Sequence, residues 1–331
     1  MLAYILRRLL YMVPTLILIS IVSFIIIQLP PGDYLTAMVA GLQQQGERVQ
    51  EEVLAALQKE YGLDRPMYMQ YLVWMKKIIL YGDFGRSFEW QRPVAEVIGQ
   101  RMLLTIIVSI ASLIFTYIVA IPIGIYSATH QYSIGDYIAT LIGFIGLATP
   151  GFLLALVLMF VAYGWFGISI GGLFSPGLED APWSLVRVWD MMKHMLVPTV
   201  VVGLAGTCSL IRVMRATLLD ELKKQYVITA RAKGLPRRRV LFKYPVRISI
   251  NPIVSSVAFI LPGIISGATI VSVVLNLPTT GPLILKALLT QDMYLAGSFI
   301  LLVALLTVIG TLLSDILLAA LDPRIRFERR G

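Results

Sequence analysis

The sequence predicts an all-α integral membrane protein with six transmembrane helices, both termini in the cytoplasm, and a periplasmic cap segment between the first two helices. Three observations support this fold class. Only 14% of the 331 residues are charged and 57% are hydrophobic, whereas about 25% of residues in soluble domains are charged. Six apolar segments approach or exceed the roughly 20 residues that span a bilayer. The basic residues gather in the loops on one side of these segments.

The first, second, third and fifth segments contain no charged residue, while the fourth contains Arg212 and the sixth contains Asp315 near its end. A long Arg side chain near a helix end can reach the membrane interface, so Arg212 is compatible with a span. The first segment is longer than the core of a cleaved signal peptide, so we expect a retained helix. The six segments are Leu9–Leu29, Met102–Tyr126, Tyr137–Tyr163, Met195–Met214, Ile248–Leu275 and Met293–Leu321.

The orientation follows from the distribution of charge. A cytoplasmic N-terminus places 17 of the 28 Lys and Arg residues inside, but only 6 of the 19 Asp and Glu residues. The positive-inside rule therefore places both termini in the cytoplasm. The net charge of +9 reflects this topology, and nucleic-acid binding is the weaker interpretation because the largest basic cluster is tethered between two membrane segments.

Three regions follow along the chain. Residues 1–30 form the cytoplasmic N-terminus and the first span, 31–101 form the external cap segment, and 102–331 form the membrane core with a cytoplasmic loop at 215–247. Within the cap segment, Met67–Leu80 is an amphipathic helix with Tyr71, Trp74 and Ile78 on one face.

Two prolines are each followed by glycine inside a predicted span, Pro150 and Pro262. An internal proline removes a helical hydrogen bond and bends the helix. Bent helices suit a solute path that must open, but proline and glycine are also more frequent in membrane helices generally. Both interpretations remain open.

The internal loop contains a short helix with a complete termination signal. Tyr226–Lys233 has good helix formers, Gly234 occupies the position that favours a left-handed residue, and Pro236 follows. Small residues such as Ala230 would let another protein approach the backbone closely. The alternative is a basic loop that binds anionic lipid headgroups.

This stretch resembles a known motif. Residues 226–235, YVITARAKGL, are similar to the EAA loop of ABC-importer permeases in its peptide-transporter form. In that family the loop forms a coupling helix that inserts into a groove on the ATPase subunit. The glutamate and first alanine of the general motif are replaced by Ile228 and Thr229. The resemblance implies ATPase-coupling roles for Tyr226, Thr229, Ala230, Arg231, Ala232, Lys233 and Gly234.

Further similarities cover nearly the whole chain. They include the start at residues 1–10, the Pro-Gly-Asp of 31–33, two motifs at 61–66 and 82–88, and the ending at 321–324. Together they resemble the first permease type of the dipeptide, oligopeptide and nickel transporter family. Departures occur at 277–281, at Pro245 and at Pro30. The resemblance implies that the binding protein faces Asp33, Gly82, Asp83, Phe84, Gly85, Ser87 and Phe88.

The sequence signals for ATP binding and for metal binding are absent from the chain. The chain has no G-x-x-x-x-G-K-[ST] phosphate loop, so we expect a transport subunit without an ATPase site, with ATP and Mg²⁺ held by partner subunits. One Cys and two His make no metal-ligand spacing. A proton-coupled secondary transporter is the alternative, but such carriers use intramembrane carboxylates, and Asp315 is the single candidate.

The resemblance implies half of a translocation path in a bacterial or archaeal cytoplasmic membrane. Its expected partners are a second homologous permease, two ATPase subunits and an extracytoplasmic solute-binding protein. The solute would be a peptide, although members of the family also carry oligosaccharides and opines. ATP-driven closure of the ATPases would move the coupling helices and switch the permease between inward-open and outward-open states.

Overall fold

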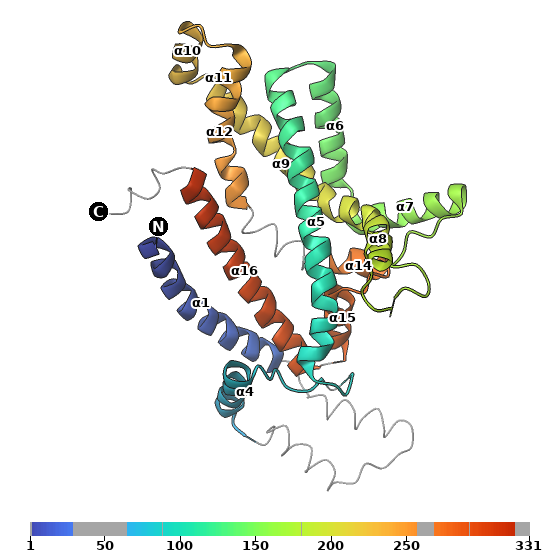
Figure 1. Cartoon of the computed structure of the whole chain (residues 1–331). Helices are drawn as coiled ribbons and strands as arrows, with labels where there is room; N and C mark the ends of the chain where they lie inside the picture. Colours follow the sequence, from blue (N-terminus) through green and yellow to red (C-terminus); the bar gives the residue numbers. More distant parts are fainter. Residues whose placement is uncertain are drawn as a thin grey trace. The chain divides into compact units, whose positions relative to one another are not determined.

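The computed structural model describes residues 2–28, 65–87, 89–179, 181–256, 268–290 and 292–321. Within them the chain is helical, and the β-structure is limited to an isolated bridge between Arg86 and Pro93. The helices (Figure 1) are α1 (Leu2–Gln28), α4 (Met67–Tyr81), α5 (Val94–Thr129), α6 (Ile134–Ala148), α7 (Gly151–Phe166), α8 (Leu185–His194), α9 (Leu196–Leu222), α10 (Gln225–Ala232), α11 (Arg237–Lys243), α12 (Pro245–Ser249), α14 (Thr269–Val274), α15 (Thr280–Leu289) and α16 (Met293–Leu321).

Three described helices are long and apolar enough to cross a membrane: Val94–Thr129, Leu196–Leu222 and Tyr294–Ile316. They correspond to the second, fourth and sixth predicted spans. The first predicted span lies in α1, whose described apolar part, Leu10–Ile25, is shorter. Part of the fifth, with Pro262, lies outside the described residues.

The third predicted span is not one continuous helix. The chain leaves α6 after Ala148, and α7 begins at Gly151 at an angle of 102° to α6. Pro150 is the N-cap residue of α7 with φ −59° and ψ 133°. Pro disfavours the helical conformation of its preceding residue, and Thr149 accordingly has an extended backbone with ψ 119°. The pair α6–α7 would count as a fourth span if both helices belong to one crossing.

The helices divide into two compact units. Unit 1 contains Met1–Arg8, Ile106–Pro278 and Leu306–Gly331, and unit 2 contains Leu9–Thr105 and Thr279–Leu305. In unit 1, α5 and α6 form a helical hairpin that packs on α9. Glycines permit this close packing, because a Cβ at Gly124 would lie 2.6 Å from Met214 and one at Gly203 would lie 2.9 Å from Phe115. The neighbouring core joins α5, α9 and α12.

In unit 2, α4 packs on α1 through Tyr71 and Trp74, two residues of the face that the helical spacing predicts. Trp74 is buried, and its ring lies 5.7 Å from that of Phe24 between centroids. The hydroxyl groups of Tyr71 and Ser20 form a hydrogen bond of 2.8 Å. Gly82 ends α4 in the left-handed conformation with φ 64°. The assignment of residues 31–101 to an external cap stays a prediction.

Candidate functional site

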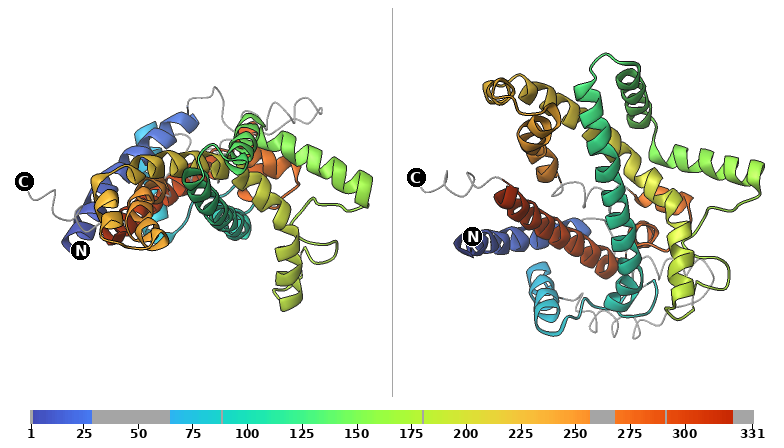
Figure 2. Two further views of the ribbon diagram at one scale, coloured as in Figure 1. Left: turned by 90° about the horizontal axis from the view of Figure 1, so that it is seen from above. Right: turned by 45° about the horizontal axis from the view of Figure 1, so that its top comes forward.

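The candidate coupling site is the pair of short helices α10 and α11, which follows directly on α9. In both views of Figure 2 and in Figure 1, this pair lies at the end of α9 opposite α8. The helix α10 ends at Ala232, and the backbone N–H of Gly234 donates to the carbonyl of Arg231 at 3.0 Å. The predicted left-handed conformation of Gly234 is confirmed by its φ of 76°. Pro236 is the N-cap residue of α11, so the chain turns sharply between the two helices.

A small hydrophobic core holds α10 against α11. Val227, Ala230 and Val240 are buried at 0%, 6% and 1% exposure, with Tyr226, Leu235 and Tyr244 packed around them. We expected Ala230 to present its small side chain to another protein, but it is buried within the pair. Its small side chain faces Val240's helix because the position three residues after Val227 lies on the same face of α10.

The other coupling residues lie on the surface of the pair. Thr229, Arg231, Ala232, Lys233 and Gly234 are exposed, as is Ile228 at 49%. No atom lies within 4 Å of a Cβ built on Gly234. Glycine at this position is therefore required by its positive φ and leaves an open approach to the backbone. Of the two alanines, Ala232 and not Ala230 has its small side chain at the surface of the pair.

Tyr226 connects α10 to the end of α9. Its half-buried hydroxyl donates to the carboxylate of Glu221. Burial raises the pKa of the Tyr226 hydroxyl, and the hydrogen bond to Glu221 and the charge of that carboxylate raise it further. The hydroxyl therefore stays protonated and keeps donating at physiological pH. Glu221 was not among the site residues predicted from the sequence, although it precedes Tyr226 by only five residues.

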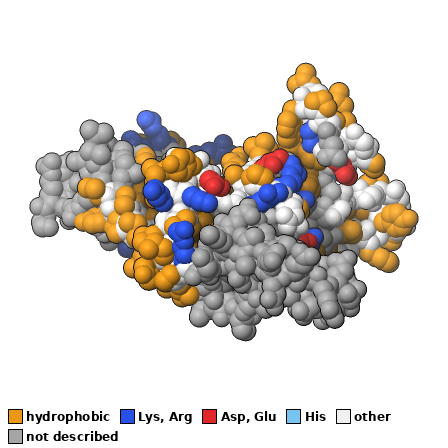
Figure 3. Space-filling view, turned by 90° about the horizontal axis from the view of Figure 1, so that it is seen from below, with side chains coloured by type: hydrophobic (Ala, Val, Ile, Leu, Met, Phe, Trp, Pro, Cys, Tyr) orange, Lys and Arg blue, Asp and Glu red, His pale blue; other side chains and the backbone are white. Residues whose placement is uncertain are grey.

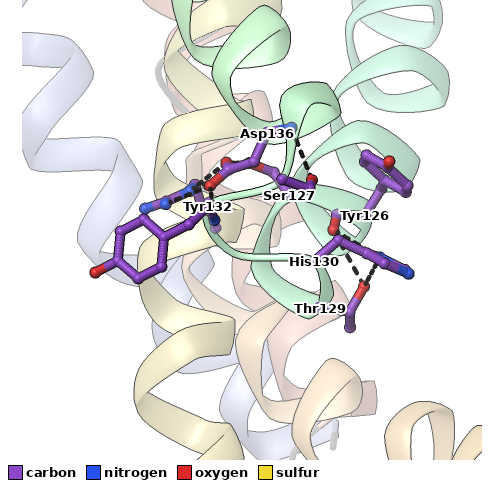
Figure 4. Close-up of polar contacts among 8 residues, drawn as sticks. Tyr126, Ser127, Thr129, His130, Tyr132 and Asp136 are labelled. Atoms are coloured by element: carbon purple, nitrogen blue, oxygen red, sulfur yellow. Dashed lines mark hydrogen bonds and ion pairs between the residues drawn. The ribbon is translucent and has the colours of Figure 1, made fainter.

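Further along α9, a buried ion pair joins this helix to the α5–α6 turn (Figure 4). The Arg215 guanidinium donates to both carboxylate oxygens of Asp136 at 2.8 Å, and its Nε also donates to the Ser127 hydroxyl at 3.1 Å. The Asp136 side chain is 3% exposed. The Ser127 hydroxyl and the Tyr132 backbone N–H donate to the same carboxylate. Each oxygen of Asp136 thus has at least two donors, as a buried carboxylate requires.

The turn that carries Asp136 is itself well ordered by local contacts. Ser133 caps α6, because its hydroxyl accepts from the Asp136 backbone N–H at 3.2 Å. Tyr126 and His130 stack with ring centroids 4.7 Å apart on the other side of the turn (Figure 4). Asp136 and Arg215 contribute to the prediction from sequence only through the charge count. Asp136 immediately precedes the third predicted span and Arg215 immediately follows the fourth, and no local pattern in the sequence pairs them.

The predicted binding-protein-facing residues differ in how far they are exposed. Gly82 and Asp83 are exposed, and the Asp83 carboxylate accepts from the Gly85 backbone N–H at 2.9 Å. Phe84 and Gly85 are half-buried, and the Phe84 carbonyl accepts from the Trp74 indole at 3.3 Å. Asp33 and Phe88 lie outside the described residues.

Ser87 faces the interior of unit 2. Its side chain is fully buried, and its hydroxyl donates to the Asp292 carboxylate at 2.5 Å. The Glu89 backbone N–H donates to the same oxygen at 3.2 Å. A Cβ at Gly85 would lie 2.8 Å from the Tyr294 ring. Gly85 and Ser87 therefore pack against the start of α16. In the described part of the 82–88 motif, the exposed residues are Gly82, Asp83 and Arg86.

Two family models match the chain. Residues 120–327 match the inner membrane component of binding-protein-dependent transport systems, and residues 1–111 match the N-terminal part of the membrane component of these systems. The first match contains the whole α9–α10–α11 region and the Asp136–Arg215 pair.

Curated relatives are similar over the full length. The oligopeptide transport system permease protein AppB of Bacillus subtilis is 35% identical, with 99% of this chain and 100% of the relative covered. The dipeptide transport system permease proteins DppB of Alkalihalophilus pseudofirmus and of Escherichia coli are each 31% identical with the same coverage. The chain therefore belongs to the family of binding-protein-dependent transport system inner membrane components.

Proposed function

We propose that this chain is the membrane-spanning permease subunit of an ATP-driven importer of peptides. The observation that carries the proposal is the end-to-end similarity to oligopeptide and dipeptide permeases, at 35% and 31% identity. The chain would form half of the translocation path beside a second, homologous permease. Two ATPase subunits would hold ATP and Mg²⁺, and an extracytoplasmic binding protein would deliver the peptide. We also propose six spans with both termini in the cytoplasm of a bacterial or archaeal cell.

The geometry of the α10–α11 pair supports the coupling role. The open backbone at Gly234 and the small exposed side chain of Ala232 suit insertion into a groove of an ATPase subunit. Because Val227, Ala230 and Val240 pack the two helices together, a push on α10 also moves α11. The Tyr226–Glu221 hydrogen bond passes this displacement to α9.

The buried ion pair extends this path into the membrane part. Arg215 on α9 holds Asp136 at the start of α6 and Ser127 near the end of α5. A displacement of α9 would therefore carry the α5–α6 turn with it. A rigid transfer of this kind is what alternating access requires, because the ATP-driven step must bias one of two arrangements of the spans.

Co-purification and uptake test the proposed function. The tagged full chain, expressed with the proposed partner subunits, should co-purify with the ATPase subunits and support ATP-dependent peptide uptake. The purified chain alone should not hydrolyse ATP. A proton-coupled carrier would instead purify without ATPase subunits and take up solute along a pH gradient in their absence, and that result would overturn the proposal.

A further inference from the structure

Helix α8 has an apolar face that points away from the protein. Leu185, Trp189 and Met192 are 90%, 61% and 53% exposed. Their spacing of four and three residues places them on one side of the helix, and Val188, at 36% exposure, lies beside them. Hydrophobic side chains cover much of the surface of α7 and α8 in Figure 3.

The polar face of α8 points inward, towards the loop that precedes it. Asp190 accepts from the backbone N–H and the hydroxyl of Ser175, both at 2.7 Å, and His194 lies 3.6 Å from its carboxylate. Arg187 donates to the carbonyls of Ala181 and Glu179. The guanidinium lies 4.6 Å from the centroids of both the Phe174 and Trp183 rings.

This arrangement is the reverse of a helix on a water-exposed surface. In a soluble protein the apolar stripe packs on the core and the polar face meets water. Here two polar side chains of α8, Arg187 and Asp190, are bound by the preceding loop, and the apolar stripe has no covering within the described residues of unit 1. The medium outside α8 must therefore be apolar.

The position of α8 in the chain identifies that medium. Only Met195 separates α8 from α9, an apolar helix of 27 residues that is about 40 Å long at 1.5 Å per residue. The exposed Leu196 and Val200 of α9 continue the stripe. The α10–α11 pair lies at the other end of α9, so α8 lies where α9 enters the opposite surface of the bilayer.

The composition of α8 fits the lipid headgroup region. Its 10 residues are too few to span a bilayer. Tryptophan is enriched at membrane interfaces, and Trp189 belongs to the stripe. The Lys193 ammonium lies 5.7 Å from the Trp189 ring centroid and is exposed at the border of the stripe, where it can reach lipid phosphates.

We propose that α8 is an interfacial helix that lies in the outer leaflet, with Leu185, Trp189 and Met192 among the acyl chains and the bound polar face towards the 167–184 loop. The lipid surface is its partner, and Lys193 meets the headgroups. The helix thereby sets the depth at which α9 enters the membrane. This inference goes beyond the proposed function and does not depend on which solute is transported.

Site-directed fluorescence tests the inference. The full chain, with the subunits that co-purify with it, is placed in nanodiscs after Cys208→Ser removes the single cysteine. Single cysteines from Leu185→Cys, Trp189→Cys and Met192→Cys carry an environment-sensitive dye. Glu179→Cys, in the exposed part of the preceding loop, is the matched control. Each site is quenched with aqueous iodide and with nitroxide lipids labelled either near the headgroup or deep in the acyl chain.

The three stripe positions should be quenched several-fold more by the shallow nitroxide lipid than Glu179→Cys, and less by iodide. Iodide quenching equal to that at Glu179→Cys would place α8 in water and overturn the inference. Protection from both quenchers would place α8 under another protein subunit and would overturn it as well. Loss of ATPase co-purification with unchanged lipid quenching would contradict the proposed function and leave this inference standing.

Discussion

At the scale of single residues, Gly234 shows a local backbone requirement within the proposed coupling segment. Its φ of 76° lies in a region that is costly for residues with a Cβ, and most costly for β-branched ones. The surroundings impose no steric reason for glycine, because the space beside its Cα is empty. Backbone conformation alone explains the residue within this chain.

We predict that Gly234→Val weakens ATPase co-purification by about tenfold. The left-handed conformation costs about 1–2 kcal/mol with a β-branched residue, and about 1.4 kcal/mol corresponds to a factor of ten in binding. Gly234→Asn is the control, because Asn tolerates this conformation. Affinity of the ATPase subunits for each purified variant gives the comparison. Wild-type affinity in Gly234→Val would contradict the docking role of this turn.

The Asp136–Arg215 ion pair should contribute to the stability of the folded chain. Removing one partner of a buried ion pair leaves the other charge unpaired, which costs about 3–5 kcal/mol. Arg215 is 28% exposed, so part of this cost is relieved by solvent or headgroups.

Asp136→Ala should therefore lower the thermal unfolding midpoint of the purified chain, with a loss of about 3 kcal/mol or less. The matched control is Asp220→Ala, since Asp220 is an exposed acid on the same helix as Arg215, and it should change stability by less than about 0.5 kcal/mol. Equal midpoints for the two variants would show that the pair is not formed in the purified protein.

At the scale of elements, one face of α10 packs against α11 and another face is open to a partner. Ala230 lies in the core of the pair at 6% exposure, whereas Ala232, two residues later, is exposed. The two alanines are close in sequence, yet a bulky residue would act differently at each. One would disturb the fold of the pair and the other would disturb only its approach to a partner.

We expect Ala230→Trp to destabilise the pair, because overpacking costs about 1–3 kcal/mol, and Ala232→Trp to leave it folded. Amide hydrogen exchange of residues 225–244 should rise in the first variant only. Both variants should lose ATPase co-purification. Retention of the ATPase subunits by Ala232→Trp would remove this face of α10 from the docking surface.

The contact between α8 and its preceding loop should depend on pH. The hydrogen bonds from Ser175 lower the pKa of Asp190 below its ordinary value of 3.8. The carboxylate form therefore stabilises this contact above about pH 4, and the stabilisation is lost as the pH falls through the lowered pKa. This is the expected sign for a carboxyl group whose pKa is depressed by folding.

Ser175→Ala should raise the pKa of Asp190 towards its ordinary value, since it removes the hydroxyl donor and leaves the backbone donor. The acid-induced release of α8 should then begin at a higher pH than in the parent. Amide hydrogen exchange of residues 174–192 across the acid range, compared with the parent at each pH, measures this shift. An unchanged pH midpoint would mean that the Ser175 hydroxyl does not stabilise the carboxylate.

At the scale of the whole molecule, the charge distribution supports the proposed topology. The proposed six spans with cytoplasmic termini put α10 inside and the 167–184 loop outside. Both segments contain exposed residues that accept a label, Gln225 and Glu179. The single native cysteine, Cys208, is buried and can be removed first.

In intact cells, an impermeant thiol reagent should label Glu179→Cys and should label Gln225→Cys only after the membrane is opened. The physical basis is the excess of Lys and Arg around Gln225, which holds that loop on the cytoplasmic side. Labelling of Gln225→Cys from outside would refute the topology, and labelling of both sites from outside would require a different number of spans.

Much of the architecture and of the coupling segment follows from the sequence alone, because the physics involved is local. A bilayer span needs only composition and length, so the apolar centres of the helices at 94–129, 196–222 and 294–316 were predictable. The ends were less so, because the first of these helices begins before the predicted Met102 and the second continues beyond the predicted Met214. The end of α10 was predictable to within one residue, since a glycine followed by a proline two residues later stops a helix wherever it lies. The packed face of α4 followed from helical spacing.

The tertiary structure decided what depends on contacts between distant residues. Ser87 and Asp292 are 205 residues apart, and Asp136 and Arg215 are 79 apart, so no local pattern joins them. The inward face of Ala230 depends on where α11 packs, and the outward apolar face of α8 depends on the loop that binds its polar side. The size of the bend at Pro150 also came only from the structure. A proline within a span allows kinks of many sizes, so the sequence did not specify the angle of 102°.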